Sequence, residues 1–383
     1  MLFSLNPNTP QCDVFRVLND ELLHFLCQSV NATAFSDALF STYQDGQNIL
    51  RSECWENEPT RVKFQVLWNE LPQDVPQRQQ LYDQINAAQT INTFFSDTFN
   101  SPPRLPDNQF NVLKQLTTHL FTRTASLVNI ERQAGTAVKA HFQLFRQANG
   151  NTQLCYVCGT SQLSQDRIGR PDNEQWRADY DHLLCKDKHP IYGVHPGNFI
   201  PTCHICNSKA KGSFDLLYRA ANQRRLAFYP LPPLQESCSS YMSVTMGIKQ
   251  LHELTVGNWE QPLGDVMISF TNASYNIEQK INTWIDAFQV PSRVKSFIAD
   301  SLVVRLTTDL LAPTSFQEFT SRLRHYAANV PLDVKRTEWR FWLFRLYQYL
   351  SQQDDILLQS VWALMEWNIQ QTNQQALNAE FGV

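Results

Sequence analysis

Four of the nine cysteines fall into two C-x-x-C pairs, Cys155/Cys158 and Cys203/Cys206. Each pair places two thiolates on one tight turn, where both can bind the same tetrahedral zinc ion. Two such turns complete a four-thiolate site that leaves no position open to water, which is typical of a structural zinc ion. The alternative is four unrelated cysteines, buried or redox-active, but two C-x-x-C pairs favour the metal.

The stretch between the two pairs is long and contains most of the titratable residues of this region. Forty-four residues separate Cys158 from Cys203, whereas about 15–20 is usual for a zinc ribbon. The stretch is rich in Cys, His, Asp, Arg, Pro and Gly and has few apolar stripes. A segment of this composition needs a source of stability other than a large core of its own, and a metal ion can supply it.

Asp181 and His182 are adjacent within this stretch, at the end of a predicted short strand. Neighbouring side chains of a strand point to opposite faces, so both serve one site only if the strand ends there and the chain turns. A loop is expected next, because turn-forming residues follow: Pro190, Gly193, Pro196 and Gly197. A second short strand is predicted at residues 198–202, and a helix is predicted to begin at Cys206-Asn207.

Each of these residues has a simpler interpretation when taken alone. Asp181 and His182 could form an ordinary surface pair, and Asn207 could cap a helix. Their position between and beside the cysteine pairs is what favours a hydrolytic site. Three further histidines are expected to be packed or solvated more often than to bind a ligand: His189, His195 and His204.

The order of these motifs resembles that of the HNH nuclease family, whose core is a ββα-metal fold. The family pattern is Asp-His, a loop, an Asn, and then C-x-x-C-Asn, often followed by Lys. Here Asp181-His182, Asn198 and the run from Cys203 to Lys209 fill these positions. The match lies within residues 151–228 and is closest to the zinc-stapled, four-cysteine branch of the family. A shared fold does not by itself give a shared function, so the site residues must carry the argument.

The resemblance implies a role for each matching residue. His182 would be the general base that takes a proton from the attacking water, and Asp181 and Asn207 would bind a catalytic Mg²⁺ or Mn²⁺ ion. Asn198 would orient the histidine through the loop backbone. Phosphodiester hydrolysis requires an activated water and neutralisation of charge on the phosphate, which an unprotonated imidazole and an oxygen-bound divalent ion supply. We therefore expect a metal-dependent HNH endonuclease with a structural zinc ion.

Basic side chains are concentrated in the middle of the chain. The net charge is +4 over residues 104–150 and +3 over residues 151–228, but −7 over residues 1–103 and −4 over residues 229–383. A positive middle permits a phosphate-binding surface, although solvated helix faces are equally consistent with it. No base-reading motif is evident, so we expect recognition of the nucleic-acid backbone, with DNA expected over RNA. The candidate phosphate contacts are Lys186, Lys188, Lys209 and Lys211.

The composition excludes several classes of protein. Hydrophobic residues make up 43% of the chain and aromatic residues 12%, which excludes a mainly disordered chain. No apolar run approaches the roughly 18 residues of a membrane span, and the first residues lack the basic and apolar regions of a signal peptide. The odd number of cysteines argues against a disulfide framework. We expect a cytoplasmic protein without membrane contact.

Three domains are predicted from the length and the hydrophobic pattern. Residues 1–150 form a helical N-terminal domain, residues 151–228 the HNH nuclease domain, and residues 229–383 a C-terminal domain of short strands and then helices. The fold class is α+β, mostly helical, with a central zinc-stapled ββα-metal HNH domain. Residues 1–100 and 112–148 repeat apolar residues at helical spacing.

The C-terminal domain adds two specific expectations. Residues 241–248 and 266–270 alternate apolar and polar residues as strands do. A stripe of tryptophans that includes Trp339, Trp342 and Trp362 is expected to lie in the core, although a partner surface would show the same spacing.

The biological setting is open. The helical arms could recruit a protein partner such as a defence ATPase, form a homo-oligomer or gate access, and such long flanks resemble nucleases of bacterial anti-phage defence. A different class of function is a zinc-ribbon module that binds nucleic acid without cleaving it. Asp181-His182 together with Asn207 discriminates between the two, because a binding module does not need them. A third alternative is a structural role in a complex, in which the central segment has lost its activity. It is the least favoured of the three, since every motif position is filled.

Overall fold

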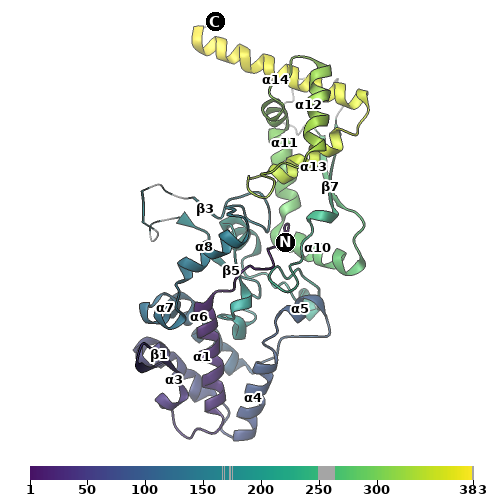
Figure 1. The fold of residues 1–383 in the computed structure, drawn as a ribbon. Coiled ribbons are helices and arrows are strands. Elements are labelled where there is room, and N and C mark those ends of the chain that lie inside the picture. Colours follow the sequence, from purple (N-terminus) through teal and green to yellow (C-terminus); the bar gives the residue numbers. More distant parts are fainter. Residues whose placement is uncertain (166, 168, 172–173, 175, 249–263, 382–383) are drawn as a thin grey trace.

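The computed structural model describes residues 1–381 except 166, 168, 172–173, 175 and 249–263. The molecule is elongated: the N-terminal helices lie at one end, the C-terminal helices lie at the other, and the cysteine-rich segment lies between them (Figure 1). Helices predominate, and the strands of the described residues form two-stranded antiparallel sheets. The predicted α+β class is confirmed. No described helix is long and apolar enough to cross a membrane.

The N-terminal part consists of helices and one hairpin. The helices are α1 (Asp13–Ser29), η1 (Asp37–Leu39), α2 (Glu53–Glu56), α3 (Glu58–Glu70), α4 (Val75–Ala87), α5 (Asn92–Ser96), α6 (Asp107–Thr122), η2 (Thr124–Ser126), α7 (Val128–Ala134) and α8 (Val138–Ala148). The hairpin pairs β1 (Thr42–Asp45) with β2 (Asn48–Arg51). Helix α1 carries apolar residues at helical spacing and buries Leu18, Leu22 and Phe25, with α4 and α7 packed beside it.

Two features of this part differ from the helical prediction. The β1–β2 hairpin interrupts the first hundred residues at a two-residue loop that begins with Gly46, whose φ of 61° suits such a turn. The predicted helical run over residues 112–148 is broken into four elements. Gly135 ends α7 with a left-handed φ of 67°, a conformation that a helix cannot pass through. The predicted end before Asn149 is confirmed, because α8 stops at Ala148.

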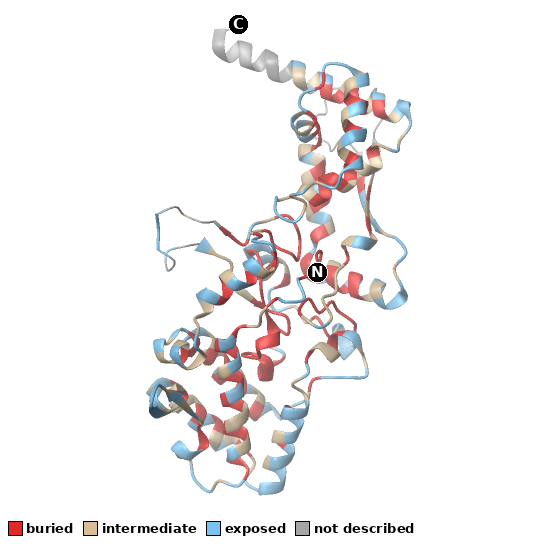
Figure 2. Ribbon diagram, in the orientation of Figure 1, coloured by how far each residue is buried: buried red, intermediate tan, exposed pale blue. Residues whose placement is uncertain are grey.

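The cysteine-rich segment forms short strands and helical turns. They are β3 (Ser164–Gln165), β4 (Trp176–Arg177), β5 (Tyr180–His182), η4 (Pro190–Tyr192), η5 (Pro196–Asn198), β6 (Phe199–Pro201), η6 (Ile205–Lys211) and η7 (Ala220–Asn222). β5 pairs with β6, and β3 pairs with β4. Every residue from 189 to 203 is buried (Figure 2). The flanking helices supply this burial: the rings of Phe15 and Phe121 stack on Phe199, with centroids 4.1 and 5.5 Å away.

The C-terminal part begins with a second hairpin and continues as helices. Its elements are η8 (Ser239–Tyr241), β7 (Met242–Ile248), β8 (Gly264–Phe270), α10 (Tyr275–Phe288), α11 (Val290–Asp309), α12 (Phe316–Ala328), α13 (Arg340–Leu350) and α14 (Asp355–Phe381). Both alternating stretches are strands, as predicted, and they pair with each other. Trp342 and Trp362 are buried and Trp339 is partly buried in the core, so the prediction that the tryptophans pack inside is confirmed.

The N-terminal residues and two helices of the C-terminal part contact the first cysteine turn. Trp284 of α10 and Trp342 of α13 donate their indole N–H groups to the carbonyl oxygens of residues 157 and 158, each at 2.9 Å. The backbone N–H of Phe3 donates to the carbonyl of Tyr156 at 3.0 Å. The turn that carries two of the cysteines is therefore held between the N-terminal residues and helices α10 and α13.

The hydrogen bond from Trp342 gives a first prediction. Trp342→Phe keeps an aromatic ring but leaves the buried carbonyl of Cys158 without this donor, so we expect the free energy of unfolding in urea to fall by about 1–3 kcal/mol. Trp176→Phe is the matched control, because Trp176 is 58% exposed and a surface change of this kind costs less than about 0.5 kcal/mol. Equal effects of the two variants would contradict the anchoring role.

Candidate functional site

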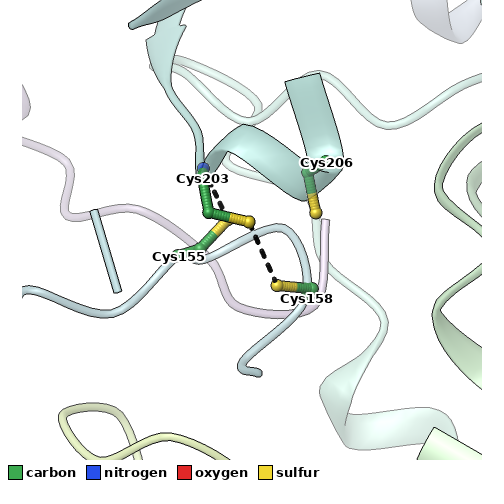
Figure 3. Close-up of side chains that lie close together, drawn as sticks. All are labelled: Cys155, Cys158, Cys203 and Cys206. Atoms are coloured by element: carbon green, nitrogen blue, oxygen red, sulfur yellow. Dashed lines mark hydrogen bonds between the residues drawn. The ribbon is translucent and has the colours of Figure 1, made fainter. Parts of the chain in front are cut away.

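The four cysteines predicted to bind zinc lie together. Their Sγ atoms are all within 4.8 Å of one another, and all four residues are buried (Figure 3). The Sγ atoms of Cys158 and Cys203 are 3.9 Å apart. Zn–S bonds of about 2.3 Å in a tetrahedron place sulfur atoms about 3.8 Å apart. Burial raises the pKa of the Cys155 thiol well above its usual range, whereas the hydrogen bond with Cys155 lowers the pKa of Cys203. The cluster fits a structural zinc ion.

A cation and a hydroxyl face the thiols from outside the cluster. The Thr160 hydroxyl donates to the Sγ of Cys158 at 3.2 Å. The guanidinium of Arg293, on α11, donates to the Sγ of Cys206 at 3.5 Å and to the Thr160 hydroxyl at 2.7 Å. Four thiolates and one Zn²⁺ carry a net negative charge, which the guanidinium partly offsets. The sequence held no sign of this contact, since Arg293 lies 87 residues after Cys206.

His182 is buried and fixed by one hydrogen bond. Its Nε2 lies 3.1 Å from the carbonyl oxygen of Gly193. A carbonyl oxygen only accepts, so Nε2 carries the proton and Nδ1 keeps its lone pair. The ring packs against Phe121 and Phe199, with centroids 4.6 and 4.7 Å away. Burial is the main cause that lowers the pKa of His182 to about 3; the charges of two nearby lysines add to this shift, and the hydrogen bond to Gly193 opposes it. The imidazole is therefore neutral near pH 7.

Asn198 closes the loop that holds His182. Its amide oxygen accepts a hydrogen bond from the backbone N–H of Leu184 at 2.6 Å. Its amide nitrogen donates to the carbonyls of Leu184 and Tyr192 at 3.0 and 2.8 Å. Tyr192 immediately precedes Gly193, the acceptor for His182. Asn198 thus fixes the backbone that orients the imidazole without touching the ring.

Asp181 forms a buried ion pair that was not predicted. The ammonium of Lys211 lies 2.8 Å from Asp181 Oδ1 and 2.7 Å from the carbonyl oxygen of His182. Asp181 Oδ2 is buried without a hydrogen-bond partner among the described residues. Burial raises the pKa of Asp181 while Lys211 opposes the shift. A buried carboxylate with one unpartnered oxygen can accept a further cation ligand.

Asp181, His182, Asn207 and Lys211 line one cavity of about 720 Å³. Asn207 lies in η6, a π-helical turn that begins between the last two cysteines. Such turns are frequent at functional sites. The Asn207 side chain makes no hydrogen bond to the described residues, so its amide oxygen is available to a ligand. Asp181 and Asn207 together offer the hard oxygen ligands that Mg²⁺ or Mn²⁺ prefers.

The lysines and the further histidines named from the sequence differ in whether they line this cavity. Lys186 lines the same cavity, with its Nζ 5.3 Å from the Phe121 ring centroid. Lys188 and Lys209 are exposed, whereas Lys211 is buried. None of the three other histidines lines the cavity. His189 pairs with Asp215 at 3.1 Å, His195 bonds to a backbone carbonyl of the N-terminal part, and His204 is exposed.

Part of the cavity is lined by residues of the N-terminal part, and the sequence did not predict their role. These residues are Phe15, Phe121, Ala125, Ser126, Glu131, Val138, Lys139 and Phe142. They lie far from the cysteine motifs in the chain, and their spacing is that of ordinary helix faces. Tertiary packing alone brings them to Asp181 and His182.

Comparisons of the chain with family models, with curated proteins and with solved structures find no match. The resemblance to the HNH family therefore rests on the motif residues of the sequence.

The zinc cluster gives a prediction about metal content. The purified protein should contain one zinc per chain by plasma mass spectrometry. Cys203→Ser should lose it and destabilise the central segment, because the two turns are then no longer tied together. Cys27→Ser is the matched control, since Cys27 lies on α1 outside the cluster and its change should leave zinc content and melting temperature unaltered. Unchanged zinc in Cys203→Ser would contradict the site.

The ion pair of Lys211 gives a prediction about the second metal. Lys211→Met leaves the buried Asp181 unpaired, which should cost about 3–5 kcal/mol without added metal. It also removes a cation that competes for Asp181. Saturating Mn²⁺ should therefore raise the melting temperature of Lys211→Met more than that of the wild type.

Two further variants calibrate this measurement. Lys209→Met is the control, because Lys209 is exposed and outside the cavity, and it should behave as the wild type. Asn207→Ala should reduce the Mn²⁺-dependent shift. An equal shift in Lys211→Met and the wild type would argue against competition at Asp181.

Proposed function

We propose that this chain is a metal-dependent endonuclease of the HNH type that hydrolyses phosphodiester bonds, with DNA as the expected substrate. One observation carries the proposal: Asp181, His182 and Asn207 line the same cavity beside the four-cysteine cluster. β5 and β6 pair across a loop that contains η4 and η5, and η6 follows β6, which is the order of a ββα-metal core. Asp181 and His182 lie on the first strand, and Asn207 lies on the helical turn.

His182 is the general base in this proposal. Its Nδ1 is the free ring nitrogen, because Nε2 donates to Gly193. A neutral imidazole lining the cavity can accept the proton of a water molecule that attacks the phosphorus atom. Asn198 keeps the loop carbonyl, and through it the ring, in one orientation. The contacts of the ring with Phe121 and Phe199 exclude bulk water from its faces.

The cations of the cavity act on the phosphate. A divalent ion bound by Asp181 and Asn207 would neutralise charge on the scissile phosphate and its leaving oxygen. Lys211 lines the cavity and holds Asp181 in the structure. Once Asp181 has another cationic partner, the ammonium of Lys211 is available to a phosphate oxygen. In this proposal Lys211 pairs with Asp181 first, and it contacts a phosphate oxygen once a divalent ion is bound to Asp181.

A second function is favoured by the same ion pair. A module that binds nucleic acid through its zinc-stapled segment and cleaves nothing would keep Lys211 on Asp181 permanently, with no need for a divalent ion. Such a module would bind nucleic acid with or without Mg²⁺ and would not cleave it.

Cleavage assays with and without Mg²⁺ or Mn²⁺ separate the two functions. The wild type should cleave nucleic acid only with the divalent ion, and His182→Ala should lower the rate by roughly 10²–10⁴-fold while keeping its zinc. His204→Ala is the control, because His204 is exposed and outside the cavity, and it should cleave as the wild type does. Equal rates for His182→Ala and the wild type would refute the mechanism. Absence of cleavage on every substrate would favour the binding module.

A further inference from the structure

We infer that Arg293 is the counter-ion of the four-cysteine zinc site, and that it couples zinc binding to the docking of the C-terminal helices. Arg293 belongs to α11 and lies 87 residues after Cys206 in the chain. The inference goes beyond the proposed function, because it does not depend on cleavage of nucleic acid. It requires that the four cysteines bind zinc, which their separation and burial allow.

The guanidinium of Arg293 reaches both cysteine turns. Its Nη1 donates to the Sγ of Cys206, on the second turn, at 3.5 Å, and its Nη2 donates to the Thr160 hydroxyl at 2.7 Å. That hydroxyl donates in turn to the Sγ of Cys158, on the first turn, at 3.2 Å. One side chain of the C-terminal part therefore contacts a thiol of each C-x-x-C pair, one directly and the other through a hydroxyl.

The charge of this guanidinium is matched to a negatively charged cluster. Arg293 is partly buried, and within the described part of the chain its side chain bonds to a thiol and a hydroxyl and to no carboxylate. A partly buried cation is stabilised by a negative charge close to it. Four thiolates around one Zn²⁺ carry a net negative charge, whereas four neutral thiols carry none. The zinc-bound cluster is therefore the form that Arg293 stabilises.

Other groups of the C-terminal part hold the first cysteine turn beside Arg293. The indoles of α10 and α13 bond to two of its carbonyl oxygens, and the backbone N–H of Trp339 donates to the carbonyl oxygen of Gly159 at 3.0 Å. The ring of Trp339 stacks on that of Phe297, with centroids 3.7 Å apart. Phe297 lies one helical turn after Arg293 on α11. The contact of Arg293 is thus one of a set that forms when these helices are docked on the turn.

A contact that needs both the zinc and the docked helices makes the two equilibria dependent on each other. If docking of the helices raises the zinc affinity by some factor, zinc binding raises the docking constant by the same factor. Arg293 carries this coupling directly, because the cluster supplies its negative partner and α11 supplies its position. Arg293 is a positioning residue of the zinc site, and the C-terminal helices determine how firmly the metal is held.

Competition for zinc with a chelator of known affinity tests the role of Arg293 in the full chain. Arg293→Gln should bind zinc about 10–100-fold more weakly than the wild type, as is usual when a residue that supports metal ligands is removed. Lys295→Gln is the matched control, because it removes a positive charge from an exposed side chain two residues further along α11. It should bind zinc as the wild type does. Equal zinc affinity of Arg293→Gln and Lys295→Gln would overturn the inference.

Two further variants of the same residue separate its charge from its packing. Arg293→Lys keeps the positive charge, although it loses the planar fork of donors, and should recover part of the zinc affinity that Arg293→Gln loses. Arg293→Met keeps only the apolar stem of the side chain and should recover none. If Arg293→Met held zinc as tightly as Arg293→Lys, the side chain would act by packing alone and the counter-ion role would be wrong.

Hydrogen exchange of the wild type, with zinc and after its removal by a chelator, tests the coupling without any variant. The backbone N–H of Trp339 is bonded to Gly159 of the first cysteine turn, so its exchange should become faster when zinc is removed. The amides of α3 (Glu58–Glu70) are the internal control, because this helix belongs to the N-terminal part, and their exchange should not change. Unchanged exchange at Trp339, or an equal change in α3, would contradict the coupling.

Discussion

The contact of four thiols is the constraint on which the rest of the central structure depends. It joins two turns that are held by different parts of the chain. The first turn, at Cys155 and Cys158, is bonded to the N-terminal residues and to two tryptophans of the C-terminal helices. The second turn begins η6, which carries Asn207 and Lys211. A zinc ion at the sulfur atoms would therefore determine where Asn207 and Lys211 lie relative to Asp181 and His182.

The Asp181–Lys211 pair stabilises a carboxylate that is 3% exposed. A lone carboxylate at this depth would be costly, and the ammonium offsets much of that cost. In the proposed function, a divalent ion would replace the ammonium at a carboxylate that is already in place. This arrangement explains why a residue that resembles a surface phosphate contact in the sequence is among the most buried lysines of the protein.

The sequence was most informative where the relevant contacts are local. The two C-x-x-C spacings, the Asp181-His182 pair at a strand end and the helical turn after Cys206 could all be predicted, because neighbours in the chain determine them. Lys211 was predicted as a phosphate contact, and its ion pair was not predicted, since its partner Asp181 lies 30 residues earlier and no local pattern links them.

Long-range packing accounts for what could not be predicted. Arg293 reaches the cysteine cluster and Phe121 reaches His182 from helices whose own patterns indicate only a buried face. The central segment was expected to be polar with little core of its own, yet it is buried, because helices from both flanks pack over it. The shape of the cavity depends on this packing.

The central claim is that one metal ion organises the segment while a second binds beside His182. Anomalous diffraction from a crystal grown with Mn²⁺, recorded at the zinc and manganese absorption edges, tests it most directly. The account predicts a zinc peak about 2.3 Å from all four sulfur atoms. It also predicts a manganese peak between the side-chain oxygens of Asp181 and Asn207, with the Lys211 ammonium moved away. Cysteines without a zinc peak, or a manganese-free cavity with Lys211 still on Asp181 at saturating Mn²⁺, would contradict it.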